Sequence, residues 1–467
     1  MDQGRVLYRD FWDLKPPGIF LFYWVSGHVV GFDGISVHLF ELGFMSAFGV
    51  LLVLVLKPRF HLKALSALLP LATVGVYYSV CWSWHLTQVE GLIGPFLFLS
   101  LWLSLAPPGQ RGTPRRWPMV LSGLVGGVVL LFKPLFLLLL CGFWIPSLVR
   151  TITNHPLRRW SVAWGQAAAV VGGIALPLLA VVASFADFGA LSSLCHTLFV
   201  IPSRVLSEMP PVGMERLRQG LFWFLTRFGP LFPPAAIGAW TRLRGRADPL
   251  GVGLVLWILV GLGVILLQRQ SWWEYHYLLL LVPFGILAVF GVDSTIAAVQ
   301  SSAFFRARPR RWALLALVGL LILPFARAIG SKSLKMAKLG GVFQHLSLND
   351  YRTMLDPHYG VALRETAFLR STGSLPGDIY VLGDPEFYVV SGRGQQISLS
   401  GWGPELFLPE QWATLARELE ARPPTFLFIA EGAVPLISAR SPETGRMLER
   451  VYVPVKNSSN GVWYSPR

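Results

Sequence analysis

The chain has 467 residues, of which 53% are hydrophobic and only 14% are charged. Soluble domains carry about 25% charged residues, so this composition excludes a single water-soluble globule and predicts a polytopic α-helical membrane protein. The net charge of +15 would suit nucleic-acid binding if the basic residues formed one patch, but they are spread over separate loops, and no nucleic-acid partner is expected.

The chain begins with a segment in which charged and aromatic residues are mixed, YRDFWDLKPPG at residues 8–18. The apolar stretch that follows, residues 19–31, is too short to span a bilayer. We therefore expect it to form an amphipathic helix at the membrane interface. Residues 1–36 are interpreted as an external loop that includes this interfacial helix.

The middle of the chain, residues 37–330, is predicted to be the transmembrane domain. It holds about 10 apolar segments, most with the roughly 17 to 25 residues that a spanning helix needs; they lie at 37–56, 64–82, 91–106, 118–132, 134–149, 162–185, 221–241, 249–268, 278–297 and 313–330. Residues 118–149 fit either one long helix or two short helices that turn at Lys133–Pro134. Two helices preserve the alternation of loops described next, so we expect two.

Five connections between the apolar segments are rich in Lys and Arg. Together they hold 16 such residues, and they lie at 57–63, 107–117, 150–160, 242–248 and 305–312. Basic loops stay on the cytoplasmic side of a membrane, so every second connection is expected on the outer side. Topology thus accounts for the positive net charge.

The last part of the chain, residues 331–467, is predicted to be a small α/β domain. Charged residues return there and the apolar runs shorten to strand length. We expect helices at 362–373 and 409–424, and strands at 378–383, 387–392, 425–432 and 450–455. The alternation of loops places this domain outside the membrane.

Ionisable residues gather in three of the connections expected outside. They are Asp10, Asp13 and Lys15 near the start, Glu90 in the second connection, and Glu274 with His276 in a later one. Ionisable residues at membrane depth are costly and often mark functional sites. Two acids and a lysine near the interface suit a lipid phosphate, a divalent metal or a hydroxyl group awaiting deprotonation.

Each of these residues also has a simpler explanation. Asp10 and Asp13 pair equally well with Arg9 and Lys15 as an ordinary surface loop. Glu90 suits the first turn of a helix, and His276 suits an aromatic belt at the interface. FKP at 132–134 has the composition of a turn. No single residue decides between these explanations.

Three motifs together resemble one family. They are GRVLYRDFWDLKPPG at 4–18, TQVEG at 87–91 and EYHYLLLLVPFGILAV at 274–289. They are similar to the first external loop, the acidic second loop and a late helix of the GT-C glycosyltransferases that use polyprenyl-phosphate sugars. This family includes the protein O-mannosyltransferases and the aminoarabinose transferase acting on lipid A. The resemblance covers essentially the whole chain and implies a bacterial inner (plasma) membrane location.

The resemblance implies an inverting, metal-assisted transfer of a sugar from a polyprenyl-phosphate donor to a lipid, glycan or protein hydroxyl on the outer face. It implies catalytic roles for Asp10, Asp13 and Glu90, contacts of Asp13 and Glu90 with Mg²⁺ or Mn²⁺, and donor-phosphate contacts for Lys15 and Arg9. His276 and Tyr277 match the late helix only loosely, and Lys133 is a further candidate from the turn before Pro134.

Two alternatives to an active transferase remain open at this point. A flippase or transporter for lipid-linked sugars predicts charges near the bilayer midplane and internal repeats, which are not evident. The second alternative is that the chain is a catalytically inactive relative of this family. The resemblance implies a first helix and an acidic base before the glycine corresponding to Gly4, so we expect the natural chain to start upstream. With this start, Asp10 or Asp2 must act as base, or the protein is inactive.

Overall fold

The computed structural model describes residues 4–32, 35–105, 116–154, 159–210, 212–244, 248–301, 347–355, 357–371 and 377–467, together with residues 319 and 330. The chain forms two compact units. The α/β unit comprises Met1–Lys15, Ala183–Pro210 and Ala337–Arg467, and the helical unit comprises Pro16–Val182 and Pro211–Met336. These units group residues by contact, whereas the predicted ranges 1–36, 37–330 and 331–467 concern the membrane and stay predictions.

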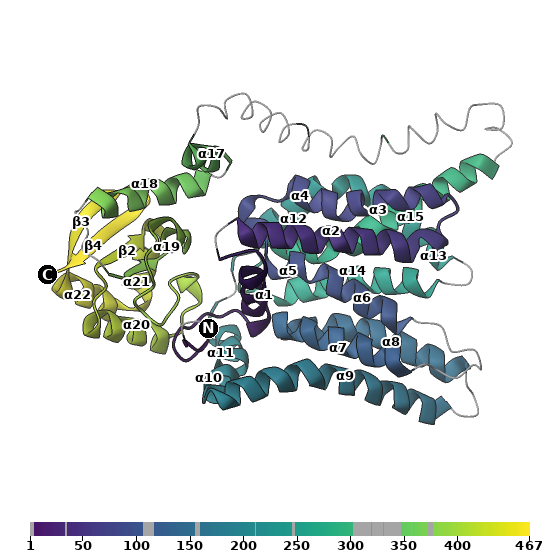
Figure 1. The fold of residues 1–467 in the computed structure, drawn as a ribbon, viewed down its shortest axis with the longest axis horizontal. Helices are drawn as coiled ribbons and strands as arrows, with labels where there is room; N and C mark the ends of the chain where they lie inside the picture. Colours follow the sequence, from purple (N-terminus) through teal and green to yellow (C-terminus); the bar gives the residue numbers. More distant parts are fainter. Residues whose placement is uncertain are drawn as a thin grey trace. The chain divides into compact units, whose positions relative to one another are not determined.

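The helical unit is built from apolar helices that lie alongside one another (Figure 1). Among the described residues, five helical stretches are long and apolar enough to cross a membrane: Ser36–Arg59, Lys63–Val80, Trp160–Asp187, Pro249–Leu267 and Glu274–Ser301. They contain α2 (Ser36–Leu56), α3 (Leu68–Pro70), α4 (Val76–Val80), α9 (Arg159–Asp187), α14 (Pro249–Leu267) and α15 (Leu281–Ser301). The other helices described in this part of the chain are α1 (Pro17–Val29), α5 (Val89–Leu92), α6 (Gly94–Ser104), α7 (Arg116–Phe132), α8 (Leu137–Asn154), α12 (Met214–Phe228) and α13 (Phe232–Leu243).

Proline positions explain where several helices end. Helix α7 stops at Phe132 and α8 starts at Leu137, so the predicted pair of helices in 118–149 is confirmed. Pro134 cannot donate the backbone hydrogen bond that would continue α7. The segment expected to span the membrane at 221–241 covers the end of α12, a 3₁₀ turn at Gly229–Leu231 and most of α13, so it is helical with one break, and its span stays a prediction. The span expected at 313–330 lies outside the described residues, apart from residues 319 and 330.

Helix α1 forms where the short helix was expected, but it is not amphipathic. Ile19 and Phe22 are buried, while Leu21, Trp24 and Val29 on its other side are exposed. Apolar residues therefore occupy both faces of the helix, and the expectation of a polar face is wrong. Its position at the interface stays a prediction.

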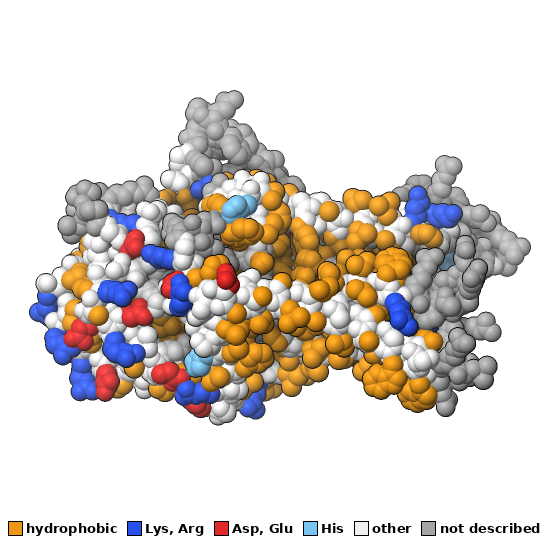
Figure 2. Space-filling model, turned by 60° about the horizontal axis from the view of Figure 1, so that its bottom comes forward, with side chains coloured by type: hydrophobic (Ala, Val, Ile, Leu, Met, Phe, Trp, Pro, Cys, Tyr) orange, Lys and Arg blue, Asp and Glu red, His pale blue; other side chains and the backbone are white. Residues whose placement is uncertain are grey.

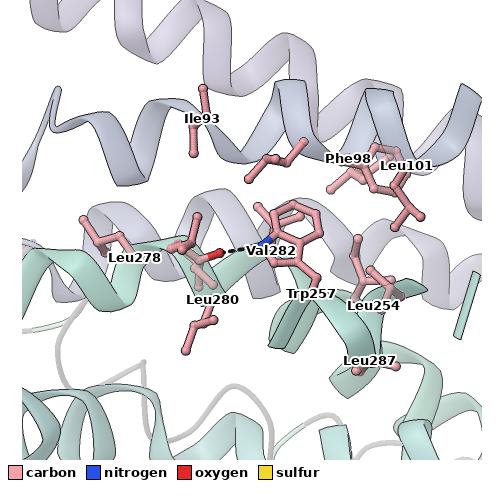
Figure 3. Packing of buried hydrophobic residues seen from close by; sticks show 14 of the residues in the cluster. Ile93, Phe98, Leu101, Leu254, Trp257, Leu278, Leu280, Val282 and Leu287 are labelled. Carbon is pink, nitrogen blue, oxygen red and sulfur yellow. Dashed lines mark hydrogen bonds between the residues drawn. The ribbon is translucent and has the colours of Figure 1, made fainter. Parts of the chain in front are cut away.

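The core of the helical unit is apolar and closely packed. Trp257 of α14 is fully buried, and its indole N–H donates to the Leu279 carbonyl at 3.0 Å (Figure 3). Leu101 of α6 and Leu287 of α15 belong to the same cluster. Apolar side chains also cover most of the visible surface of this unit, whereas charged side chains are frequent on the α/β unit (Figure 2). Such a surface suits a hydrocarbon environment.

The α/β unit contains a four-stranded mixed sheet in the order β1-β2-β4-β3. The strands are β1 (Ile379–Leu382), β2 (Phe426–Ala430), β3 (Tyr452–Ser458) and β4 (Gly461–Pro466), with β1 parallel to β2 and β4 antiparallel to its neighbours. The helices described in this unit are α10 (Leu191–Cys195), α11 (Ile201–Glu208), α17 (Leu348–Leu355), α18 (Pro357–Ser371), α19 (Glu386–Ser391), α20 (Pro409–Ala421), α21 (Val434–Arg440) and α22 (Pro442–Val451).

Alternating residues of the sheet build two separate apolar layers. Tyr380 and Leu427 face a cluster that includes Trp412 of α20, while Val381 and Phe428 face a cluster on the opposite side. This is the period-2 pattern of a sheet covered on both faces. The predicted strands at 378–383, 425–432 and 450–455 and the predicted helices at 362–373 and 409–424 are confirmed.

The strand expected at 387–392 is wrong, because this segment forms helix α19. Asp384 accepts a hydrogen bond from the Glu386 N–H at 2.9 Å, which supplies an acceptor at the helix start. Phe387 packs against Phe428 of the sheet, and Gly392 ends the helix in the left-handed conformation. Tertiary packing has overridden the strand preference of the two valines. Strand β4 was not expected from the sequence.

Candidate active site

A buried ion pair lies at one end of the helical unit. The Glu90 carboxylate in α5 is only 2% exposed, and its Oε1 accepts a hydrogen bond from the Lys133 ammonium group at 2.6 Å. The same ammonium group also donates to the Gln268 side-chain oxygen. His276 Nε2 lies 3.7 Å from Glu90 Oε1. We call Glu90, Lys133, Gln268 and His276 the Glu90 cluster.

The cluster is assembled from connections that are far apart in the sequence. Lys133 has an extended backbone between α7 and the 3₁₀ turn Pro134–Phe136. Gln268 follows the last residue of α14, and His276 lies in the 3₁₀ turn Glu274–Leu280 that leads into α15. These connections are among those that the positive-inside rule places on one side of a membrane. Their contacts in the helical unit agree with that alternation.

The Glu90 cluster has fewer hydrogen bonds than its burial calls for. A buried carboxylate is stable only when it is paired, which Lys133 provides. In contrast, His276 Nδ1 is buried and has no hydrogen-bond partner among the described residues. The side-chain amide nitrogen and oxygen of Gln270, two residues beyond Gln268, are also buried without a hydrogen-bond partner among the described residues. Buried polar groups without partners are uncommon and call for an explanation, such as a ligand.

Two further residues border this region. The Glu274 carboxylate lies 3.3 Å from Nε2 of the buried His85. The ring of Tyr277 stacks on Phe224, with centroids 4.9 Å apart. Tyr277 therefore belongs to the apolar packing between α12 and the turn before α15, and its predicted role in the site stays a prediction.

The predicted phosphate-binding and acidic residues of the opening segment lie in the α/β unit. Arg9 forms two hydrogen bonds of 2.9 Å with the Asp10 carboxylate and donates to the Phe188 carbonyl at 2.7 Å. Asp10 also accepts from the Val6 N–H. The Arg9 guanidinium and the Val6 N–H lower the pKa of Asp10 to about 2. A carboxylate with so low a pKa is a weak proton acceptor at neutral pH.

Asp13 and Lys15 are left with groups available for a ligand. Asp13 Oδ1 accepts the Lys15 N–H at 2.9 Å, which closes a local turn. The Lys15 carbonyl accepts from the Tyr8 hydroxyl at 2.6 Å. Within the described residues the Lys15 ammonium group forms no hydrogen bond or ion pair. The turn thus carries a lysine and an aspartate two residues apart, with the Lys15 ammonium group and the second Asp13 oxygen outside its hydrogen bonds.

This segment is anchored by its backbone. The Trp12 N–H donates to the Ser398 carbonyl at 2.7 Å, and the Ser400 N–H donates to the Trp12 carbonyl at 2.9 Å. The Trp12 indole donates to Thr197 Oγ1 at 3.0 Å. The opening segment therefore joins the rest of the α/β unit through a short β-bridge, which was not expected from local composition.

The expected metal site is not tested by this geometry. No group of three or more His, Cys, Asp and Glu side chains that suits a metal ion occurs among the described residues. The two expected ligands, Asp13 and Glu90, belong to different compact units. Metal assistance stays a prediction.

Sequence reasoning missed one member of the Glu90 cluster, Gln268. Its signal is the polar run QRQS at 268–271, directly after a long apolar segment. The same reasoning regarded Lys133 mainly as a turn residue, and its contact with Glu90 depends on tertiary structure.

Long apolar helices around a buried ion pair, together with a small α/β unit, define a polytopic helical fold of the membrane type. The chain has the fold of ArnT from Cupriavidus metallidurans. Its structure matches the crystal structure bound to undecaprenyl phosphate with a TM-score of 0.55 and 13% identity, covering 97% of this chain and 87% of that one. It matches the apo crystal structure with a TM-score of 0.53 and 14% identity, with the same coverage.

The likeness confirms the fold that the motif resemblance predicted. No protein-family model matches the chain, and no curated protein matches it. At 13% identity the likeness concerns the fold, so the roles of individual residues rest on the geometry above.

Proposed function

We propose that this chain is a membrane glycosyltransferase that moves a sugar from a polyprenyl-phosphate donor to a hydroxyl group of a lipid, glycan or protein on the outer face of the membrane. The observation that carries the proposal is the ArnT fold over 97% of the chain, in a relative that has been crystallised with undecaprenyl phosphate. The Glu90 cluster supports it, because buried ionisable groups among apolar helices are costly and often mark functional sites.

The donor class fits the surface of the helical unit. Each CH₂ group of a polyprenyl chain costs about 0.8 kcal/mol to expose to water, so the sugar phosphate has to react at the membrane surface. A protein with apolar outer helices and polar groups at their ends can meet such a donor without extracting it. This argument favours a lipid-linked donor over a soluble nucleotide sugar.

The proposed reaction is a single displacement. The oxygen of the acceptor hydroxyl attacks the anomeric carbon, the bond from that carbon to the phosphate oxygen breaks, and the phosphate leaves with the electron pair. A cation stabilises the charge that develops on the phosphate, and Lys15 is assigned this task. Arg9 is less suitable because Asp10 and the Phe188 carbonyl already occupy its donors.

The acceptor proton needs a carboxylate. We assign acceptor orientation to Glu90, which Lys133 holds in its ionised form through their 2.6 Å contact. Asp13 has one oxygen that is not used in its turn and remains available for a proton or for a divalent metal. Asp10 is a weaker candidate, because its ion pair with Arg9 lowers its pKa.

The test is sugar transfer by the purified full chain in liposomes. It is supplied with undecaprenyl-phosphate sugars labelled in the sugar and with lipid A, glycolipid or peptide acceptors. Transfer to an acceptor supports the proposal. Movement of the donor across the bilayer without transfer supports a flippase, and neither activity supports a non-catalytic relative.

Two variants and a chelator locate the chemistry. Lys15→Ala and Asp13→Asn are expected to abolish transfer while membrane insertion is unchanged, because their side chains lie outside the long apolar helices. Transfer at the unmodified rate in either variant would remove the opening segment from the site. Loss of transfer with EDTA, restored by Mg²⁺ or Mn²⁺, supports metal assistance, and unchanged transfer removes the metal from the proposal.

A further inference from the structure

We propose that Glu41, on α2, is a positioning residue that fixes the connection carrying Glu90 and thereby sets the geometry of the Glu90 cluster. The kinetic test of this role rests on the proposed function. The structural part, that Glu41 fixes the connection carrying Glu90, applies to an inactive protein as well. Glu41 lies inside an apolar segment and was not singled out by the sequence motifs.

Glu41 is fully buried and binds two donors with one oxygen. Its Oε1 accepts the Tyr77 hydroxyl at 2.6 Å and the Thr87 N–H at 2.8 Å. The Thr87 N–H also lies 3.2 Å from the Tyr77 hydroxyl oxygen, so the three groups form one closed network. All three belong to the helical unit.

Thr87 needs such support because its backbone is strained. Its φ is 56°, a left-handed value that a β-branched residue rarely adopts. Strain of this kind persists only where surrounding contacts over-determine the conformation. The Glu41 carboxylate supplies such a contact, three residues before Glu90.

A second contact holds the other side of Glu90. Gly91 packs directly on the Tyr77 ring, and a Cβ at this position would lie 3.0 Å from Tyr77 Cε2. The segment from Thr87 to Gly91 is therefore fixed at both ends by Glu41 and Tyr77. Because Glu90 lies between these ends, its contact with Lys133 depends on them.

Stability alone does not account for a carboxylate here. Glu41 Oε2 is buried and has no hydrogen-bond partner among the described residues, and His38 Nδ1 approaches it only to 3.6 Å. A half-satisfied buried carboxylate costs stability. An apolar residue at this position would avoid that cost but would release the Thr87 N–H, so the carboxylate serves the turn that it binds.

The kinetic test is a double-mutant cycle. Glu41→Leu removes the acceptor and is expected to lower kcat about tenfold or more per folded protein, whereas Glu41→Gln keeps an acceptor oxygen and stays within about threefold. In a Glu90→Gln background, Glu41→Leu is expected to cause less than about a twofold further loss, because residues that act through one group are not additive. Equal losses in both backgrounds would overturn the inference. If Glu41→Leu does not fold, Tyr77→Phe removes one arm of the network for the same cycle.

The structural test needs no activity. Gln88→Cys is introduced into a chain whose three cysteines are replaced by alanine, and its reaction with a membrane-impermeant maleimide is timed. Glu41→Leu is expected to accelerate labelling about fivefold or more as the turn loosens, and Asp293→Asn, another buried carboxylate, is the matched control with less than about a twofold change. Unchanged labelling in Glu41→Leu overturns the positioning role even if the wild-type chain transfers no sugar. Accelerated labelling without any transfer would instead retain this role and refute the proposed function.

Discussion

The two ends of the helical unit both carry buried carboxylates, but they use them differently. Helix α14 begins after Asp248 and ends before Gln268, so these residues are about 30 Å apart along its axis. The Glu90 cluster lies at the Gln268 end. At the Asp248 end lies a second group, the Asp293 cluster, formed by Arg59, His61, Arg242, Asp248 and Asp293.

The Asp293 cluster is satisfied. Asp293 Oδ1 accepts the Leu62 N–H at 3.0 Å, and Oδ2 accepts the His61 N–H at 3.0 Å and contacts its ring Nδ1 at 2.8 Å. Asp248 forms ion pairs with Arg59 and Arg242. These contacts secure the basic connection after α2. Each carboxylate therefore has enough hydrogen-bond or ion-pair donors for a purely structural role.

The Glu90 cluster is different because buried polar atoms in it and beside it remain without partners among the described residues. The His276 Nδ1 atom and the Gln270 amide are buried and unmatched within the described residues. Protein interiors tolerate such groups at a cost, and functional sites are where that cost is usually found. Burial of a charge therefore does not by itself favour a site, and the difference between the two ends lies in the unsatisfied groups beside Glu90.

The largest effect is expected when Lys133 is removed. Lys133→Ala leaves the Glu90 carboxylate buried without its cation, which costs about 3–5 kcal/mol of stability and abolishes transfer. Unfolding in detergent and sugar transfer are measured together. The double variant Glu90→Met with Lys133→Met is the control, because it removes both charges and is expected to regain stability without activity. Recovery of transfer in that variant would contradict the assigned role of the pair.

A smaller effect, confined to stability, is expected at the other end. Asp293→Asn replaces one acceptor oxygen by an amide donor facing backbone N–H groups, which costs about 1–3 kcal/mol. Transfer per folded molecule is expected to stay within about twofold, because the substitution is remote from the Glu90 cluster. Thermal unfolding measures the change in stability, and sugar transfer by the monodisperse fraction measures the activity per folded molecule. A loss of transfer without a loss of stability would contradict the purely structural role of the Asp293 cluster.

His276 is expected to show the reverse pattern. His276→Phe removes Nδ1, which has no partner among the described residues, and Nε2, which lies 3.7 Å from Glu90 Oε1 and forms no hydrogen bond with it, so stability is expected to change by less than about 1 kcal/mol. Transfer is expected to fall about tenfold or more if that nitrogen contacts the substrate. Michaelis constants for donor and acceptor then indicate which one it contacts. Full activity with unchanged stability would make His276 a packing residue.

The smallest effect concerns the exposed pair of Arg9 and Asp10. The pKa of Asp10 in the folded protein is lowered to about 2, so its contribution to stability is present above its ordinary pKa and is lost as the pH falls through about 2. Asp10→Asn is expected to lower the midpoint of thermal unfolding slightly at neutral pH. The difference from wild type should shrink as the pH falls from about 4 to about 2. A difference that grows on acidification would show that the pair does not stabilise the folded state.

The sequence by itself determined the features that depend on local composition. Apolar segments predicted α2, α9, α14 and α15, the alternation of basic loops favoured a turn at Lys133–Pro134 before α8, and short runs of β-branched and aromatic residues predicted β1 and β2. These features follow from backbone chemistry and burial over a few consecutive residues. The motif at 4–18 also led to the fold that the ArnT likeness confirms.

Only the tertiary structure decided which polar groups meet. The pairing of Glu90 with Lys133 joins residues 43 apart, and the contact with Gln268 joins residues 135 apart. Packing against the sheet converted residues 386–391 into α19, and a β-bridge attached Trp12 near Ser398. In each case the stabilising partner is distant along the chain, so local propensity carries no information about it, and the burial of both partners sets the outcome.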